Sequence, residues 1–272
     1  MVAKSIKMNN MIFNWDNIQK SAVSLGMPID KRRALVREYL QAKFIYELYG
    51  QNYARKLSFI GGTALRILRN IPRFSEDLDF DNLGISDNKI EDLVGEVRKV
   101  FVRENIECEL SVKKNEEKSY FEIKFPNLLA PLEISHNPKE NLMIKVDSSK
   151  GWKKQNLETQ PLLRFGYARN ILTNSLDNLL VQKLSAYVFR EETQPRDIYD
   201  IVWLYATGAR FDKDFAESNG FADLLELAVD KYKTEGLKTT FSHKLAPFLI
   251  NPGDVSSLNT FGEVLKRLWM LV

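Results

Sequence analysis

Residues 57–66 are Leu-Ser-Phe-Ile-Gly-Gly-Thr-Ala-Leu-Arg, and residues 73–80 are Arg-Phe-Ser-Glu-Asp-Leu-Asp-Phe. The run Leu57–Ile60 is short and largely apolar, which predicts a buried strand. Gly61 and Gly62 allow a sharp turn and a close approach of a ligand to the backbone. The helix formers that follow predict a helix beginning at Gly62 or Thr63. Because the first amides of a helix lack internal partners, this helix start is a candidate phosphate site.

Two carboxylates lie on the next predicted strand. Side chains alternate across a strand, so Asp77 and Asp79 share one face while Leu78 and Phe80 point toward the core. Carboxylate oxygens with room left for phosphate oxygens suit Mg²⁺ or Mn²⁺. An Asp-x-Asp pair alone is more often a solvated turn, but the strand, glycine turn and helix directly upstream favour a metal site for nucleotide phosphates.

These two segments resemble the AbiEii/AbiGii family of nucleotidyltransferase-like toxins, within the wider DNA-polymerase-β-like nucleotidyltransferase superfamily. A second block strengthens the resemblance. Residues 183–187 (Lys-Leu-Ser-Ala-Tyr) and 194–200 (Gln-Pro-Arg-Asp-Ile-Tyr-Asp) are similar to the family's lysine-containing helix and the Arg-Asp-x-x-Asp helix that follows it. With the intervening strands, the resemblance covers residues 57–205.

The resemblance implies a metal-dependent nucleotidyltransferase that takes an NTP as substrate. It also implies the toxin of a type IV-like toxin–antitoxin or phage-defence (abortive infection) system, with the antitoxin encoded separately. Some relatives transfer nucleotides to the 3′ end of tRNA, so RNA is the first acceptor to consider. Two alternatives stay open: transfer to a protein or small molecule, and a non-catalytic nucleotide-binding regulator.

The resemblance also implies roles for individual residues. The implied catalytic residues, of which the first three would also hold the metal, are Asp77, Asp79, Asp147, Lys183 and Asp197. The implied nucleotide-binding residues are Gly61, Gly62, Thr63, Arg66, Ser75 and Lys183.

The third carboxylate of the predicted metal site has two candidates. Asp147 ends the strand-like run 142–147 in an Ile-Lys-x-acid pattern that looks like the family's third-acid strand. Glu133 lies in a proline-flanked segment closer to a loop. We prefer Asp147, either to bind a second metal or to accept the proton of the attacking hydroxyl.

Lys183 can be interpreted either as a solvated surface lysine or as a functional residue. Lys183 falls on a different face of its helix from Leu180 and Leu184, so it can point into a cleft and contact the triphosphate. Most helix lysines are simply solvated, and the functional interpretation depends on the resemblance. Asp197 can hold Lys183 or the base of the nucleotide, and the resemblance favours an active-site role for it. For Asp200, a salt bridge within the helix (Arg196 lies four residues earlier) or between domains is an equally good explanation.

The composition agrees with a cytoplasmic protein outside the membrane. No apolar run reaches the ~20 residues of a membrane span, and the first residues lack the apolar segment of a secretory signal. Cys108 is the only cysteine, so an internal disulfide is excluded. The net charge of +3 is too small to prove a nucleic-acid partner. A candidate basic rim for RNA consists of Lys113, Lys114, Lys153, Lys154, Arg164 and Arg169.

The mix of predicted elements indicates an α+β fold (mixed α/β), with a nucleotidyltransferase-like mixed sheet flanked by helices. Residues 15–56 are predicted to be helical with a break near 26–28, and residues 86–105 form an amphipathic helix. Further strands are predicted at 108–112, 120–125 and 142–147. From about residue 160 we expect mostly helix. The predicted domains are therefore 1–160, with the sheet, and 161–272, a helical domain that contributes to the active-site cleft.

Overall fold

The computed structural model describes residues 14–115 and 118–270, and it is built around one seven-stranded mixed sheet with the strand order β3-β4-β5-β2-β1-β7-β6. Parallel pairing joins β2 to β5 and β1 to β7, and the other neighbours are antiparallel. The strands are β1 (Leu57–Ile60), β2 (Asp77–Asn82), β3 (Glu109–Lys114), β4 (Lys118–Phe125), β5 (Leu142–Ser149), β6 (Leu157–Arg164) and β7 (Tyr167–Asn174). The predicted α+β class is confirmed.

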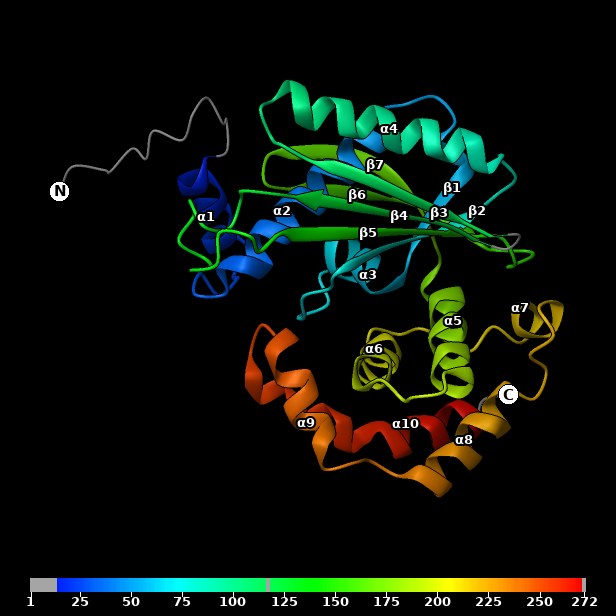
Figure 1. The fold of residues 1–272 in the computed structure, drawn as a ribbon. Coiled ribbons are helices and arrows are strands. Elements are labelled where there is room, and N and C mark those ends of the chain that lie inside the picture. Colours follow the sequence, from blue (N-terminus) through cyan, green and yellow to red (C-terminus); the bar gives the residue numbers. More distant parts are fainter. Residues whose placement is uncertain (1–13, 116–117, 271–272) are drawn as a thin grey trace.

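Helices cover both faces of the sheet (Figure 1). The helix α4 (Asp87–Arg103) lies over one face, and α3 (Gly61–Arg69) lies on the face turned toward α5 and α6. The amphipathic pattern of α4 buries Ile90, Leu93 and Val97, and Ser86 caps its first turn. The helices α1 (Trp15–Ser24) and α2 (Arg32–Leu48) are separated by the predicted break, with the 3-10 turn η1 (Ala54–Lys56) before β1.

The rest of the chain is an arc of helices beneath the sheet. Two of them, α5 (Leu176–Phe189) and α6 (Pro195–Ala206), lie between the sheet and the outer helices of the arc (Figure 1). The other elements are α7 (Lys213–Ser218), α8 (Leu224–Glu235), α9 (Thr240–Leu245), η2 (Ala246–Phe248), η3 (Pro252–Thr260) and α10 (Phe261–Met270). Across the described residues, no helix has the length and apolar character needed to cross a membrane.

The prediction of mostly helix from about residue 160 is wrong for residues 160–174, which belong to the hairpin formed by β6 and β7. Its turn carries Phe165 and Gly166 at φ +52° and +84°, as tight hairpin turns require. Pro161 is tolerated because β6 is an edge strand that pairs only with β7. The helical region therefore begins at Leu176. The predicted domain boundary at residues 160/161 falls inside β6 and stays a prediction.

Two hydrophobic clusters divide the interior. The first joins the sheet to α2 and α4 and includes Leu78 and Phe80. The second joins α5, α6, α8 and α10 and reaches Leu65 of α3. Since side chains alternate along β2, the burial of Leu78 and Phe80 in the first cluster turns Asp77 and Asp79 toward the opposite face. The acidic face of β2 is thus directed toward the helical region.

Candidate active site

The glycine turn and the acidic strand meet with no room for a side chain. Gly61 begins α3 with a φ of +75°, a left-handed conformation that glycine adopts readily. A Cβ atom at Gly61 would lie 2.1 Å from Oδ2 of Asp79. A Cβ atom at Gly62 would lie 2.5 Å from a guanidinium nitrogen of Arg73 and 2.8 Å from Oγ of Ser75. Both glycines are therefore needed so that charged and polar side chains can approach the helix start.

The register of the sheet brings a third carboxylate to the pair. In the parallel ladder between β2 and β5, Asp79 lies directly opposite Asp147. Neighbouring strands are about 4.8 Å apart, so these two side chains stand next to each other on one face. Glu133, the alternative candidate, is exposed in a turn with φ +54° and lines a different cavity, beside Asp30 and Phe248.

A cavity of about 380 Å³ opens beside these acids. Its volume lies within the range of small-molecule sites, roughly 300–1,000 Å³. Residues from β1, β2, β4, β5, α3 and α5 line it. Those that carry charge are Asp79, Lys118, Asp147, Lys183 and Arg190. A smaller adjoining cavity shares Asp79, Lys183 and Arg190 and is also lined by Gly62, Ser75, Asp77 and Arg196.

Burial disfavours the ionised form of the three carboxyl groups. It raises the pKa of Asp79 to about 7, with Lys183 opposing the shift and Asp77 and Asp147 adding to it. Burial also raises the pKa of Asp77, and burial together with Asp77 raises that of Asp147. Across residues 14–115 and 118–270, none of the three carboxylates lies within ion-pair distance of a Lys or Arg side chain. A cation placed among them would offset this mutual repulsion.

The three carboxylates suit a divalent metal that binds together with substrate phosphates better than a metal that is held by protein ligands alone. As the side chains stand, no group of three His, Cys, Asp or Glu residues in the described part of the chain has the geometry to hold a metal ion. Mg²⁺, however, is usually bound by one or two carboxylates together with substrate phosphates and water. Asp79 and its neighbours Asp77 and Asp147 supply hard oxygen donors of that kind beside an open cavity.

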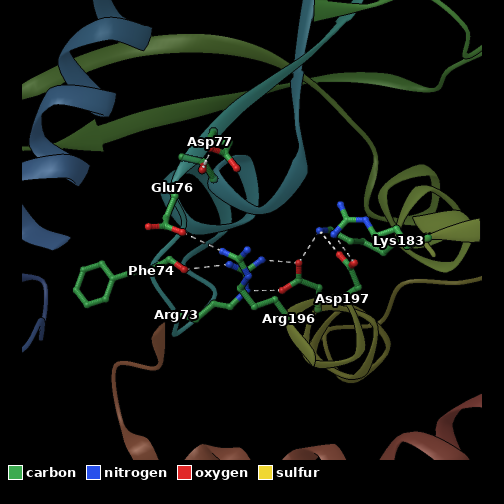
Figure 2. A network of polar contacts seen from close by, with 10 residues as sticks. Arg73, Phe74, Glu76, Asp77, Lys183, Arg196 and Asp197 are labelled. Atoms are coloured by element: carbon green, nitrogen blue, oxygen red, sulfur yellow. Dashed lines mark hydrogen bonds and ion pairs between the residues drawn. The ribbon is translucent and has the colours of Figure 1, made fainter. Parts of the chain in front are cut away.

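Lys183 points from α5 toward this site and is held by two carboxylates of α6 (Figure 2). Its Nζ lies 3.1 Å from Oδ1 of Asp197 and 2.8 Å from Oδ2 of Asp200. Burial alone would lower the pKa of Lys183, but Asp200 and Asp197 outweigh it and raise the pKa above its usual value. Arg190, at the end of α5, binds the other oxygen of Asp197 at 2.9 Å. Asp197 therefore positions two cations at the cavity wall.

The ion pair that the sequence allows between Arg196 and Asp200 does not form. Both oxygens of Asp200 are bound instead by Arg73, at 2.6 and 2.5 Å, and one of them also by Lys183. Arg196 turns to Glu76, 3.5 Å away, and stacks over the ring of Phe248. Since Arg73 lies just before β2 and Asp200 in α6, the alternative that Asp200 links the two halves of the chain is the one that the structure bears out (Figure 2).

Two residues with an implied nucleotide-binding role face elsewhere. The Thr63 side chain is fully buried, and its hydroxyl donates to the backbone carbonyl of Asp77. Arg66 is 5 % exposed and paired with Glu38 at 2.9 Å. Their side chains therefore stabilise the helix–strand unit, and the structure does not bring the Arg66 guanidinium to the cavity, because α3 presents that turn to the core.

The predicted basic rim does not form a continuous surface. Arg164 is 3 % exposed and donates to the carbonyls of Arg66 and Ile67. Arg169 is packed over Tyr46, and Lys114 is paired with Glu91. Only Lys113 and the pair Lys153 and Lys154 remain as exposed members without such contacts in the described chain.

Sequence reasoning missed several residues of the cavity wall. Arg190 follows the α5 pattern without any motif of its own, and Trp152 and Gln182 come from separate segments that meet only in the folded chain. The one available signal was proximity: Gln182 directly precedes Lys183 in the lysine block.

The glycine turn, the paired acids and the lysine helix all lie in a stretch of the chain that matches a known protein family. The sequence profile described as "Nucleotidyl transferase AbiEii toxin, Type IV TA system" matches residues 43–269. The chain belongs to the AbiEii family of nucleotidyltransferase toxins. It is accordingly a nucleotidyltransferase of a toxin–antitoxin system, and the predicted family and enzyme class are confirmed.

Solved structures agree with the AbiEii fold. The chain is similar to JHP933 from Helicobacter pylori, with 20 % identity over 88 % of this chain and 94 % of that one and a TM-score of 0.51. It is also similar to MenT4, a nucleotidyltransferase toxin from Mycobacterium tuberculosis, with 17 % identity over 93 % of this chain and 90 % of that one and a TM-score of 0.54. No curated protein sequence matches the chain.

Proposed function

We propose that this AbiEii-family enzyme transfers an NMP from an NTP to an RNA acceptor in a reaction that depends on Mg²⁺ or Mn²⁺, with the 3′ end of tRNA as the first candidate. One observation supports this most directly. Asp79 and Asp147 stand opposite each other in the β2–β5 register beside the start of α3, and the cavity they line also contains Lys183 and Arg190.

In the proposed reaction, Asp77, Asp79 and Asp147 would hold the metal, which supplies a Lewis acid for the phosphate oxygens. The start of α3, at Gly61 and Gly62, and the Ser75 hydroxyl offer donors to the β- and γ-phosphates. Of the two residues whose side chains face elsewhere, Thr63 would contribute only its backbone amide as a donor to the phosphates. Arg66 would contribute only its packing beneath this turn.

The chemical step forms a bond between the acceptor hydroxyl oxygen and the α-phosphorus, and it breaks the bond to the bridging oxygen of the β-phosphate. The hydroxyl proton passes to a carboxylate oxygen of the site, and pyrophosphate leaves. Lys183 stabilises the negative charge that develops on the phosphates. Asp197 is a positioning residue in this scheme, because it fixes Lys183 and Arg190 in place.

The experiment is a labelling assay with Mg²⁺, total tRNA and each α-³²P-labelled NTP in turn. We expect label in RNA with the wild-type protein and none with Asp79→Asn or Asp147→Asn. Label on protein or on a small molecule instead would favour the other acceptor classes. NTP binding without transfer to any acceptor would favour a non-catalytic regulator.

The biological setting of the proposal comes from the family. A type IV toxin acts beside an antitoxin encoded by a separate gene, and cytoplasmic RNA would be its target. Growth arrest on expression that disappears with Asp79→Asn would support transfer as the source of toxicity. Protection of a phage-infected culture that also depends on Asp79 would support a role in abortive infection. Unchanged toxicity of the Asp79→Asn protein would contradict both.

A further inference from the structure

The main cavity extends past the acidic residues in one direction along the sheet. Two residues beyond Asp79 and Asp147, which is about 7 Å along a strand, the β2–β5 register pairs Asp81 with Ser149. Trp152 follows three residues after Ser149, and both line the main cavity. Gln182, from α5, donates from Nε2 to Oδ2 of Asp81 at 2.9 Å and lines the same cavity.

The smaller cavity extends in the opposite direction. It is lined by Asp77, Ser75, Gly62 and Arg196, and it shares Asp79 with the main cavity. The site thus has a polar end, with a helix start and a guanidinium, and an end that contains an aromatic ring. Asp79 and Lys183 lie where the two meet. This order matches the order of a nucleotide, in which the α-phosphate lies between the nucleoside and the outer phosphates.

The indole of Trp152 is fixed in place from behind. It stacks on Phe215 with ring centroids 5.2 Å apart and planes 20° from parallel, and it contacts Phe221 at 5.4 Å. Phe215 is buried at the start of α7. Because these rings hold the indole while it also lines the cavity, an aromatic surface is presented to the cavity with little freedom left to lose on binding.

Gln182, which lines the same cavity as Trp152, has a hydrogen-bond acceptor without a partner in the described part of the chain. Gln182 Nε2 is committed to Asp81, which accepts from Gln155 and Asn174 as well. In the described part of the chain, Oε1 of Gln182 is buried without a hydrogen-bond partner. Buried polar atoms rarely remain unpaired, so an N–H group of a ligand would supply the missing donor.

We propose that Trp152 is the base-stacking platform of the nucleotide site and that Gln182 accepts a hydrogen bond from the base edge. This inference rests on the proposed function, because it assumes that the cavity takes an NTP. The nucleobase lies against Trp152, the α-phosphate lies at Asp79 and Lys183, and the outer phosphates extend toward Gly62 and Ser75.

The test compares binding of each Mg²⁺–NTP with binding of Mg²⁺–tripolyphosphate, a probe that has no base, by isothermal titration calorimetry. Removal of one stacking contact weakens nucleotide binding by about 5- to 150-fold. We expect that loss for Trp152→Ala with the preferred NTP, a much smaller loss for Trp152→Phe, and unchanged tripolyphosphate binding for both. Trp269→Ala is the matched control, since Trp269 is 51 % exposed on α10 and lines a separate groove.

Three outcomes would overturn the proposal that Trp152 is the base-stacking platform. One is NTP binding by Trp152→Ala as tight as that of the wild type, and a second is an equal loss of tripolyphosphate binding, which would indicate general damage to the cavity. The third is failure of the wild type to bind any NTP. The labelling assay separates this proposal from the proposed function. RNA labelling with unchanged affinity in Trp152→Ala would reject the platform alone, whereas base-dependent binding without transfer would reject catalysis alone.

Discussion

The guanidinium of Arg73 binds both carboxylate oxygens of Asp200, although the two residues are 127 positions apart in the sequence. Arg73 is 2 % exposed and Asp200 is 0 % exposed. Lys183 shares the same carboxylate, so the lysine at the cavity wall is held by the contact that joins the β2 segment to α6. The geometry of the site is therefore coupled to the packing of the helical region on the sheet.

Asp200→Asn should destabilise the protein strongly. Removing one partner of a buried ion pair costs about 3–5 kcal/mol, because the remaining charges stay buried without compensation. Urea unfolding monitored by circular dichroism measures this change in the free energy of unfolding. Glu263→Gln is the control, since the pair that Glu263 forms with Arg267 is exposed and should leave stability unchanged. Equal effects of the two substitutions would contradict the role assigned to Asp200.

The same variant should change how stability depends on pH. Burial alone would raise the pKa of Asp200, but Arg73 and Lys183 outweigh it and hold the pKa below its ordinary value. The stabilisation is thus complete above the unfolded-state pKa, about 3.9, and it is lost as pH falls through the lower folded-state pKa. The difference in unfolding free energy between wild type and Asp200→Asn should shrink below about pH 4. Parallel pH profiles would show that the pKa of Asp200 does not change on folding.

Gly61→Ala should abolish activity for a steric reason. An alanine in the left-handed region costs about 1–2 kcal/mol wherever it occurs, and at Gly61 its Cβ would also meet Asp79 at 2.1 Å. Gly26→Ala is a matched control, because Gly26 has a φ of +64° but nothing within 4 Å of a Cβ. Both variants should lose similar backbone stability, and only Gly61→Ala should lose nucleotide transfer in the labelling assay. Full transfer activity in Gly61→Ala would show that the close approach of the Asp79 carboxylate to Gly61 is not needed for transfer.

The part of the site that could be predicted from the sequence is the part made by local structure. The strand, glycine turn and acidic strand at 57–80 follow from turn chemistry and the period-two alternation. Asp147 was indicated by the resemblance of its strand-like run to the third-acid strand of the family, and it lies in β5. The hairpin β6–β7 could not be inferred in this way. Its inner strand is fixed by parallel pairing with β1, where Phe59 meets Thr173 across 114 residues of chain.

Side-chain roles were harder to predict than positions. Arg66 and Arg196 both carry a positive charge on a helix, but packing buries Arg66 against Glu38 and leaves Arg196 beside the smaller cavity. Arg190 reaches the site only because α5 ends next to Asp197. Such placements depend on how helices pack, and a single sequence does not specify that packing.

Arg66→Met and Arg190→Met should separate stability from substrate binding. Loss of Arg66 leaves Glu38 buried, so unfolding free energy should fall by about 3 kcal/mol while the KM for NTP stays unchanged. Arg190 is half exposed at the cavity, and its replacement should raise the KM about tenfold, as expected for one lost charge-assisted contact, with little effect on stability. Thermal unfolding and steady-state kinetics check the two arms. A raised KM for NTP in the Arg66→Met variant, measured at a temperature where the variant is folded, would indicate that Arg66 contributes to nucleotide binding after all.

Removal of divalent metal should stop transfer and leave the folded protein unaffected. A structural metal contributes to folding because its ligands form a closed set, and chelators then unfold the protein. Within residues 14–115 and 118–270 no such three-ligand set is arranged, and the acids instead line an open cavity where phosphates can complete the coordination. EDTA should therefore leave the melting temperature of the nucleotide-free protein unchanged while it abolishes RNA labelling. Adding Mg²⁺ and NTP together should raise the melting temperature more than the sum of either alone, since each completes the site of the other. A fall in melting temperature with EDTA alone would instead indicate a metal held by the protein without nucleotide.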